Sequence, residues 1–242
     1  MPLRTDAAVE SLSRRFDSHS APPDAFSMKI DDSRFKPTFE LELAERDLGR
    51  WPIAGIDEAG RGPWAGPVVA AAVMLNPSNI PPGIDDSKAL DEDGRDVIFR
   101  RIVESGAIIA TGIADVERID RDNILNATFW AMSEAFRTLA GKPRLVIVDG
   151  NRAPRLGCET RTIVKGDAKC LSIAAASIVA KVTRDRMMIA FDRDHPGYGF
   201  ARHKGYGTPE HKEALARLGV CALHRRSFRP IQLALGLIDE VA

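Results

Sequence analysis

The chain contains few cysteines and no long apolar run. Its three cysteines, Cys158, Cys170 and Cys221, are far apart and form no C-x-x-C pair, which excludes a disulfide framework and a cysteine-based zinc site. No stretch reaches the roughly 18 apolar residues of a membrane helix, and the N-terminus lacks the apolar core of a signal peptide. We therefore expect a protein of the reducing cytoplasm that does not enter a membrane.

The chain also lacks net charge, internal repeats and low-complexity tracts. Lys plus Arg and Asp plus Glu number 34 each, so overall charge argues neither for nor against a nucleic-acid partner. The segment 195–230 is nevertheless rich in Arg, Lys and His and poor in acids. Such a segment can follow the phosphates of a nucleic acid or can be the solvated face of a helix, and both interpretations stay open.

Length and apolar content indicate a globular chain with one main domain. The 242 residues, of which 44% are apolar, are enough to bury a sizeable core. Residues 1–36 are polar and mixed in charge, and are predicted to form a flexible N-terminal extension. The main domain is expected over 37–200, followed by a basic, helical C-terminal segment over 201–242.

The apolar pattern predicts an α/β fold with a mixed sheet flanked by helices. Two strands joined by a short, turn-rich link should pair antiparallel, whereas the uninterrupted apolar run 145–148 is typical of a buried parallel strand. The expected strands are 53–56, 68–75, 107–114, 145–148 and 160–164. The expected helices are 41–48, one that Ser87 caps, 122–139, 172–192, one from Thr208 that Gly219 ends, and one near Pro230.

The most informative stretch is Ile53 to Val69, where a buried strand runs into Asp57 and Glu58 and then into a glycine-rich turn. Adjacent side chains on a strand point to opposite faces, so we expect the strand to end or bend at this pair if both acids serve one site. The pair could also be a solvated turn. The glycine spacing does not match G-x-G-x-x-G, which argues against a dinucleotide site.

Two further strand ends carry an acid, namely Asp149 and Asp167. Sites in parallel sheets gather outside the carboxyl ends of strands, so these acids and the first pair are expected to converge. Carboxylates that converge repel one another unless cations lie between them, and oxygen ligands select Mg²⁺ or Mn²⁺ over Zn²⁺. Asp149 could instead form a turn, and Asp167 could instead cap the next helix.

Several weaker candidates accompany the acids. Arg61 and Lys88 could contact a phosphate or could be ordinary surface residues. Lys181 and Asp185 are expected to form only a surface pair on one helix. Tyr206 stands between glycines in a basic loop, where an aromatic ring can stack on a sugar or base.

Taken together, seven motifs make the chain similar to the bacterial ribonuclease HII family over residues 50–232. They occur in the family's order and read GIDEAGRGP at 55–63, DSK at 86–88, VDG at 148–150, VKGD at 164–167, AASIVAKVTRD at 175–185, HKGY at 203–206 and HRRSF at 224–228. The resemblance implies a ribonuclease H-like catalytic domain at 37–200 and a helical substrate-binding segment at 201–242.

The resemblance also implies an activity. It implies hydrolysis of RNA in RNA–DNA hybrids and incision 5′ of single ribonucleotides embedded in duplex DNA, leaving a 3′-hydroxyl and a 5′-phosphate. It implies a requirement for Mn²⁺ or Mg²⁺, with two ions in the substrate complex. The partner is therefore nucleic acid, and a monomer is expected.

Matching the family's motifs residue by residue implies specific roles. Asp57, Glu58, Asp149 and Asp167 form the implied active site, with the first three as metal ligands and Asp167 assisting. The glycine loop of Gly60, Arg61 and Gly62 is implied to meet the ribose 2′-hydroxyl, the group that distinguishes RNA from DNA. Tyr206 is implied to stack on the following deoxyribose, and Lys88 is a further substrate-binding candidate.

Two other functions fit the residues less well. A recombinase-like nuclease of the same broad fold would not need the glycine loop or Tyr206, and a hybrid-binding module would not need four strand-end acids. The stretch 232–235 faintly resembles a sliding-clamp-binding motif but lacks its terminal aromatic residue, so clamp contact is not supported and the stretch is expected to be one face of the last helix.

Overall fold

The computed structural model describes residues 36–239, and the expectation of a flexible extension over 1–36 falls almost wholly outside them. The chain divides into two units, residues 1–32 and 33–242, and the description that follows concerns the second. No helix among residues 36–239 is long and apolar enough to cross a membrane.

A five-stranded mixed sheet forms the centre of this unit, with the strand order β3-β2-β1-β4-β5. Its strands are β1 (Ile53–Ala59), β2 (Val68–Met74), β3 (Ile108–Ala114), β4 (Leu145–Asp149) and β5 (Glu159–Ile163). The antiparallel pairing of β1 with β2 and the parallel placement of β4 beside β1 confirm the prediction. The carboxyl ends of β1, β4 and β5 therefore lie at the same edge of the sheet.

Strand β1 is longer than the sequence suggested, and this corrects the expectation that it ends or bends before the acid pair. It runs through Asp57 and Glu58 to Ala59, with Asp57 opposite Ala71 and Glu58 opposite Ala70 of β2. The two carboxylates consequently emerge on opposite faces of the sheet.

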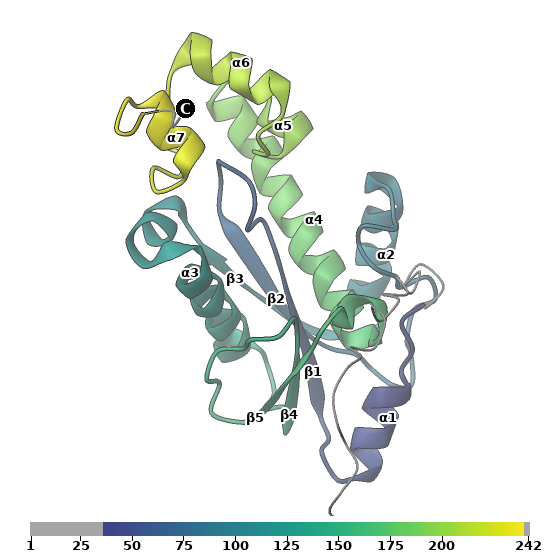
Figure 1. Cartoon of the computed structure of the whole chain (residues 1–242). Helices are drawn as coiled ribbons and strands as arrows, with labels where there is room; N and C mark the ends of the chain where they lie inside the picture. Colours follow the sequence, from purple (N-terminus) through teal and green to yellow (C-terminus); the bar gives the residue numbers. More distant parts are fainter. Residues whose placement is uncertain (1–35, 240–242) are drawn as a thin grey trace, which may run out of the picture. The chain divides into compact units, whose positions relative to one another are not determined.

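Helix α3 (Val116–Thr138) covers one face of the sheet, and the apolar residues between them form a buried core (Figure 1). The sequence predicted only the part from 122 onward, because α3 is two helical pieces joined at Asn123, whose φ is 65°. The Asn123 side chain accepts hydrogen bonds from the amides of Leu125 and Asn126 and so caps the second piece.

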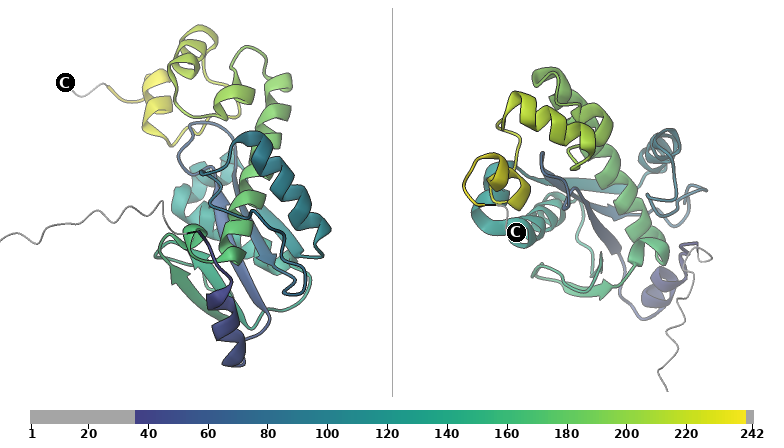
Figure 2. Two further views of the ribbon diagram at one scale, coloured as in Figure 1. Left: turned by 90° about the vertical axis from the view of Figure 1, so that its right-hand side faces the viewer. Right: turned by 45° about the horizontal axis from the view of Figure 1, so that its top comes forward.

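Helix α4 (Leu171–Asp194) covers the other face, with α2 (Glu92–Glu104) outside it, as the views in Figures 1 and 2 show. The small residues of α4 allow its backbone to approach β1 closely at Gly55. Helix α2 is capped by Asp91, not by the expected Ser87, because the Ser87 hydroxyl is instead hydrogen-bonded to Ser177 of α4 at 2.8 Å.

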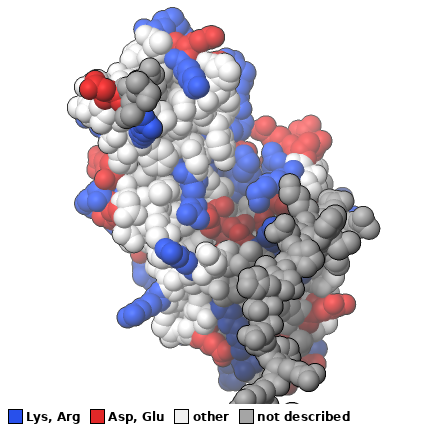
Figure 3. Space-filling view, viewed as in Figure 1, with Lys and Arg blue, Asp and Glu red and all other residues white. Residues whose placement is uncertain are grey.

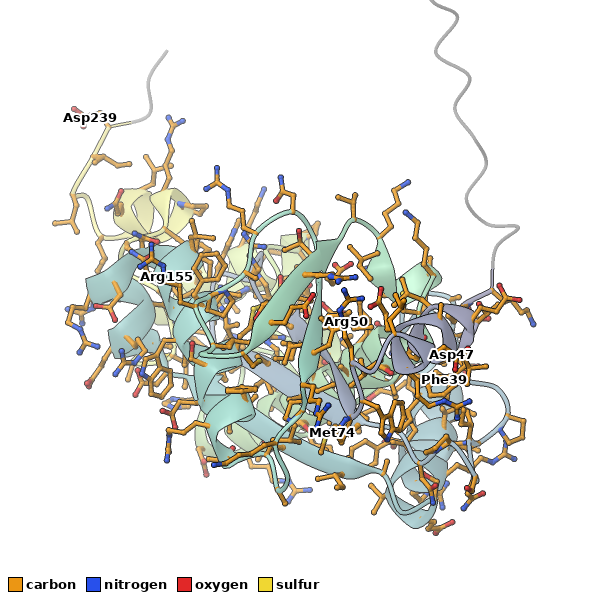
Figure 4. The ribbon with its side chains drawn as sticks, turned by 90° about the horizontal axis from the view of Figure 1, so that it is seen from below. Phe39, Asp47, Arg50, Met74, Arg155 and Asp239 are labelled. Carbon is orange, nitrogen blue, oxygen red and sulfur yellow. The ribbon has the colours of Figure 1, made fainter. Side chains whose placement is uncertain are left out.

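Helix α1 (Glu40–Asp47) precedes β1 and contacts the edge strand β5, since Glu45 pairs with Arg161 at 2.6 Å. Arg50, which Figure 4 labels close to α1, forms ion pairs with Glu45 of α1 at 2.7 Å and with Glu159 of β5 at 3.2 Å. The buried carboxylate of Glu42 accepts a hydrogen bond from the Ser172 amide, which satisfies an orphan donor at the start of α4.

Short helices beyond α4 form the C-terminal segment, which lies beside the loop between β1 and β2 (Figures 1 and 2). They are α5 (Phe200–His203), α6 (Pro209–Leu218) and α7 (Arg229–Ala234), and a 3₁₀ turn, η2 (Gly166–Ala168), precedes α4. Thr208 caps α6 and Gly219 ends it, as predicted. Arg225 attaches the segment to the sheet by donating to the carbonyls of Gly60 and Gly66.

The contact between β1 and α4 predicts a large effect for Gly55→Ala. An added Cβ would lie 2.2 Å from the carbonyl carbon of Ser172, so the helix must move away from the strand. We expect a loss of about 3 kcal/mol in the free energy of unfolding, measured by urea denaturation. Gly49→Ala is the control, since its φ is 78° with no atom within 4 Å, and should cost about 1 kcal/mol. Equal losses would contradict the prediction.

Candidate active site

A pocket of about 300 Å³ opens where the carboxyl ends of β1 and β4 meet α4 and the C-terminal segment. Figure 3 shows Asp and Glu side chains gathered in a hollow of the surface, with Lys and Arg side chains beside them. The residues that line the pocket are Asp57, Glu58, Ala59, Gly60, Arg61, Gly62, Ser87, Lys88, Arg95, Asp149, Ser177, Lys181, Arg184 and Tyr206. Eight of the nine site residues predicted from the sequence are in this set, and the ninth, Asp167, is hydrogen-bonded to Lys88.

Asp57 and Glu58 reach the pocket although they leave β1 on opposite faces. Asp57 is 5% exposed and holds its own strand end, since its Oδ1 accepts from the Glu58 amide at 2.7 Å. Glu58 and Asp149 also line a second cavity of about 330 Å³, which α3 residues such as Phe129 border. The acids therefore share one edge of the sheet, with Asp57 toward α4 and Glu58 toward α3.

Asp149 and Asp167 come from segments that meet at η2. Asp149 ends β4, and its Oδ1 accepts a hydrogen bond from the Gly166 amide at 2.6 Å. A side chain at Gly166 would crowd Ile173 and approach the Asp149 carboxylate, so glycine permits this close contact. Asp167 is 5% exposed, and its Oδ2 accepts from the Lys88 ammonium at 2.9 Å.

Burial and mutual repulsion raise the pKa of three of these carboxyl groups. The pKa of Asp57 is well above its usual range, because the group is buried and the charges of Glu58, Asp149 and Asp167 repel its own. Burial also raises the pKa of Glu58, against the opposing effect of Arg61, and that of Asp149, against the Gly166 hydrogen bond. The four acids thus lie within electrostatic reach of one another.

Cationic side chains balance part of this charge. Arg61 donates to Glu58 at 3.1 Å, and Lys88 is paired with Asp167. Although partial burial opposes it, the hydrogen bond to Asp167 raises the pKa of Lys88. The Lys181–Asp185 pair was expected at the surface, and this is wrong: Asp185 is 5% exposed, the Nζ–Oδ2 distance is 2.6 Å, and Lys181 lines the pocket.

The donor chemistry suits a hard divalent cation, because carboxylate oxygens from β1 and β4 face one pocket and their repulsion favours a cation between them. Within residues 36–239, however, no three His, Cys, Asp or Glu side chains are already arranged as a metal centre. Glu58 and Asp167 are instead engaged by Arg61 and Lys88.

The glycine loop and Tyr206 approach each other on the wall of the pocket. Gly60 has a φ of 95°, and a Cβ there would collide with the Arg184 guanidinium, so only glycine fits. A Cβ at Gly62 would lie 3.6 Å from the Tyr206 ring. Tyr206 is 46% exposed, which leaves it accessible for stacking.

Two neutral histidines, His224 and His211, form a hydrogen-bond chain that ends at the carbonyl of Tyr206. The Cys221 amide donates to His224 Nδ1 at 3.0 Å, so the His224 proton is on Nε2. That Nε2–H donates to His211 Nε2 at 3.0 Å, and His211 Nδ1–H donates to the Tyr206 carbonyl at 2.9 Å. The hydrogen bonds therefore run in one direction toward Tyr206.

The basic segment 195–230 is divided between buried and exposed positions, which neither interpretation included. Arg225 and all three of the histidines within α5, α6 and the loop before α7 are buried, with exposures of 0% for Arg225 and His211, 1% for His224 and 8% for His203. Other cations of the segment, such as Arg202 and Lys212, remain exposed. The segment is thus partly a polar core rather than only a charged surface.

Sequence reasoning gave no role to Arg184 and Arg225, whose buried guanidinium groups bind main-chain carbonyls of the loop between β1 and β2. Arg184 lies in the matched stretch 175–185, but its polar and charged neighbours Thr183 and Asp185 gave no sign of burial. Arg225 lies in the matched stretch 224–228, but an arginine in a basic stretch is usually exposed, so its burial was not expected.

The five-stranded mixed sheet, with acids at the carboxyl ends of β1 and β4, defines an α/β protein of the ribonuclease H-like class. Comparison with known proteins agrees. The ribonuclease H2 from Pyrococcus horikoshii OT3 superposes with a TM-score of 0.66 at 25% identity, covering 76% of this chain and 97% of that one. A structure of Bst-RNase HIII in complex with Mn²⁺ has a TM-score of 0.62 at 22% identity, covers 81% of this chain and 72% of that one, and supports the fold alone.

The chain belongs to the ribonuclease HII family, whose model matches residues 54–231. A ribonuclease HII of Rhizorhabdus wittichii is 55% identical over 195 residues, which cover 81% of this chain and 94% of the relative. The protein is therefore a type 2 ribonuclease H, an endonuclease that acts on RNA in RNA–DNA hybrids, of a family that depends on divalent metal ions.

The repulsion among the acids predicts that Asp57→Asn stabilises the protein. Asparagine keeps the oxygen that accepts from the Glu58 amide but removes a buried charge that three neighbours repel. We expect the free energy of unfolding without divalent ions at pH 7 to rise by about 1–2 kcal/mol, measured by urea denaturation. Asp47→Asn changes an exposed acid outside the pocket and should have no effect. A marked loss of stability in Asp57→Asn would show that repulsion is not the dominant effect.

The buried histidines predict a loss of stability in acid. Burial, and next the neighbouring His211, lower the pKa of His224 to about 4, whereas in the unfolded chain it is near 6.5. The unfolded state therefore binds a proton first, and the free energy of unfolding should fall by about 2–3 kcal/mol as the pH drops from 7 to 4. His224→Gln should reduce this slope in urea denaturation, while His195→Gln should keep it. An unchanged slope in His224→Gln would contradict the assignment.

Proposed function

We propose that this ribonuclease H incises duplex DNA on the 5′ side of a single embedded ribonucleotide, leaving a 3′-hydroxyl and a 5′-phosphate. The observation that carries this proposal is the approach of Gly62 to Tyr206 beside the acid cluster. One wall of the pocket thus combines two features. The glycine loop leaves room for a ribose, and the exposed tyrosine ring can lie against the next sugar. Both parts are needed to recognise an RNA–DNA junction.

We infer that Asp57, Glu58 and Asp149 hold Mg²⁺ or Mn²⁺, with two ions in the substrate complex and with Asp167 assisting. The oxygen-only donors and the raised pKa values of the three ligands support this, because ions of opposite charge relieve their repulsion. When bound, such ions supply an activated water and charge stabilisation of the leaving oxygen.

The chain's own residues would orient the substrate. Arg61 and Lys88 lie at the mouth of the pocket, with Lys88 79% exposed, and are placed to meet phosphates while they balance Glu58 and Asp167. Amides of the glycine loop would hydrogen-bond the ribose 2′-hydroxyl, which DNA lacks. The Tyr206 ring would stack on the following deoxyribose, where a second 2′-hydroxyl would clash.

We further propose that the enzyme works as a monomer in the cytoplasm. All three cysteines are unpaired, which fits a reducing compartment. Clamp contact is not part of the proposal, since 232–235 lies mostly in α7, a helix of six residues that buries Ile231.

The acid assignment predicts that Asp57→Asn abolishes incision. On duplex DNA carrying one ribonucleotide, with Mg²⁺ and Mn²⁺ compared, we expect the rate to fall at least about a thousandfold, because a metal ligand and the charge it contributes are lost. Gel mapping should place the wild-type cut 5′ of the ribonucleotide.

Asp47→Asn is the matched control and should keep full activity. Undiminished cleavage by Asp57→Asn would exclude Asp57 from the site. Wild-type cleavage of long hybrids without incision at single ribonucleotides would refute the substrate proposal while leaving the ribonuclease H activity intact.

A further inference from the structure

Two arginines are fully buried without a carboxylate partner. Arg225 is 0% exposed and Arg184 is 1% exposed, and neither forms an ion pair within residues 36–239. Burial lowers the pKa of Arg225 to about 9 and that of Arg184 to about 10. A buried, unpaired guanidinium is a poor way to stabilise a fold, so these residues call for another explanation.

Both guanidinium groups bind main-chain carbonyls of the loop between β1 and β2. Arg225 donates to the carbonyls of Gly60, Arg61, Gly66 and Pro67. Arg184 donates to the carbonyls of Pro67 at 2.9 Å, Ala65 at 3.1 Å and Lys204 at 3.0 Å. The first arginine thus spans both ends of the loop, and the second joins the loop to the segment that carries Tyr206.

The bonds from Arg225 also fix where the loop's amides point. In a trans peptide the C=O and the following N–H point in opposite directions. Because the carbonyls of Gly60 and Arg61 are turned toward Arg225, the amides of Arg61 and Gly62 are turned away from it. Neither amide donates a hydrogen bond within the described part of the chain, and both residues line the pocket.

We propose that Arg225 is a positioning residue for recognition of the ribonucleotide. It holds two successive peptide planes so that the Arg61 and Gly62 amides face the pocket as a ready pair of donors for the ribose 2′-oxygen. This inference rests on the proposed function, and it adds a residue from the C-terminal segment that sets specificity without touching the substrate.

Lysine cannot replace arginine in this role. The guanidinium carries five N–H donors in a fixed plane and bonds four carbonyls at once, whereas an ammonium has three donors at a single point. Arg225→Lys should keep the charge but release one or both peptide planes.

The test compares two substrates, duplex DNA with one ribonucleotide and the same duplex with a 2′-fluoro residue, which has no hydroxyl. For each enzyme, kcat/KM is measured on both substrates. We expect Arg225→Lys to reduce the preference for the 2′-hydroxyl substrate at least tenfold. Arg226→Lys changes the exposed neighbour and should keep the wild-type preference. Equal losses on both substrates in Arg225→Lys would overturn the proposal, because they indicate only a structural role.

A second measurement does not depend on whether Arg225→Lys folds. In the Asp57→Asn protein, amide hydrogen exchange at Arg61 and Gly62 should be fast in the free state. It should slow at least tenfold with the single-ribonucleotide duplex, but not with the all-DNA duplex. Slow exchange in the free protein would place the amides in the interior and overturn the inference. Wild-type enzyme that fails to cut the ribonucleotide substrate would refute the proposed function instead.

Discussion

Repulsion among carboxylates at one edge of the sheet is the constraint to which the rest of the structure responds. The pKa of each of Asp57, Glu58 and Asp149 is raised, first because the group is buried and then because another acid of the cluster repels it, so they are held together against their own electrostatics. The rigidity needed comes from apolar packing. Cores on both faces clamp β1 and β4, and Gly55 lets the α4 backbone lie directly on the central strand. Stability is thus sacrificed locally for a site that a cation can complete, as is common at functional sites.

The C-terminal segment holds the glycine loop and Tyr206 in place without covering the pocket. The glycine loop has no side chains that could anchor it at Gly60 and Gly62, so the buried Arg225 binds it through its carbonyls. Tyr206 has an exposed ring, so the histidine chain holds its backbone instead. In both cases the polar core of the segment fixes the main chain, so the loop amides and the Tyr206 ring stay free to contact the substrate. This arrangement buries several polar groups, each of which needs a hydrogen-bond partner. Within residues 36–239 the only buried side-chain oxygens without one belong to Glu42 and Asp192, which lie outside the segment.

Local patterns predicted much of the fold. Five strands, the antiparallel start, the parallel β4 and the capping of α6 by Thr208 follow from apolar periodicity and turn chemistry, which act over a few residues. Two of the errors result from long-range contacts. Ser87 caps no helix because Ser177, 90 positions away, takes its hydroxyl, and β1 continues past Ile56 because β2 pairs with the acids' backbone. The break in α3 at Asn123 was missed because a left-handed residue inside a helical pattern leaves little trace in periodicity.

The amino-acid sequence by itself determined which residues could do the chemistry, since acids after apolar strands, glycines in the loop and a tyrosine among glycines are properties of residue type and order. Tertiary structure alone decided how those residues are held. Whether Lys181 pairs at the surface or in the pocket, and whether Arg225 meets solvent or the carbonyls of Gly60 and Arg61, depends on burial, and burial is set by segments more than 100 residues apart coming into contact. The sequence does not fix the environment of a Lys or Arg side chain. Only the fold supplies the burial and the carbonyl acceptors that make such a side chain part of the protein's interior.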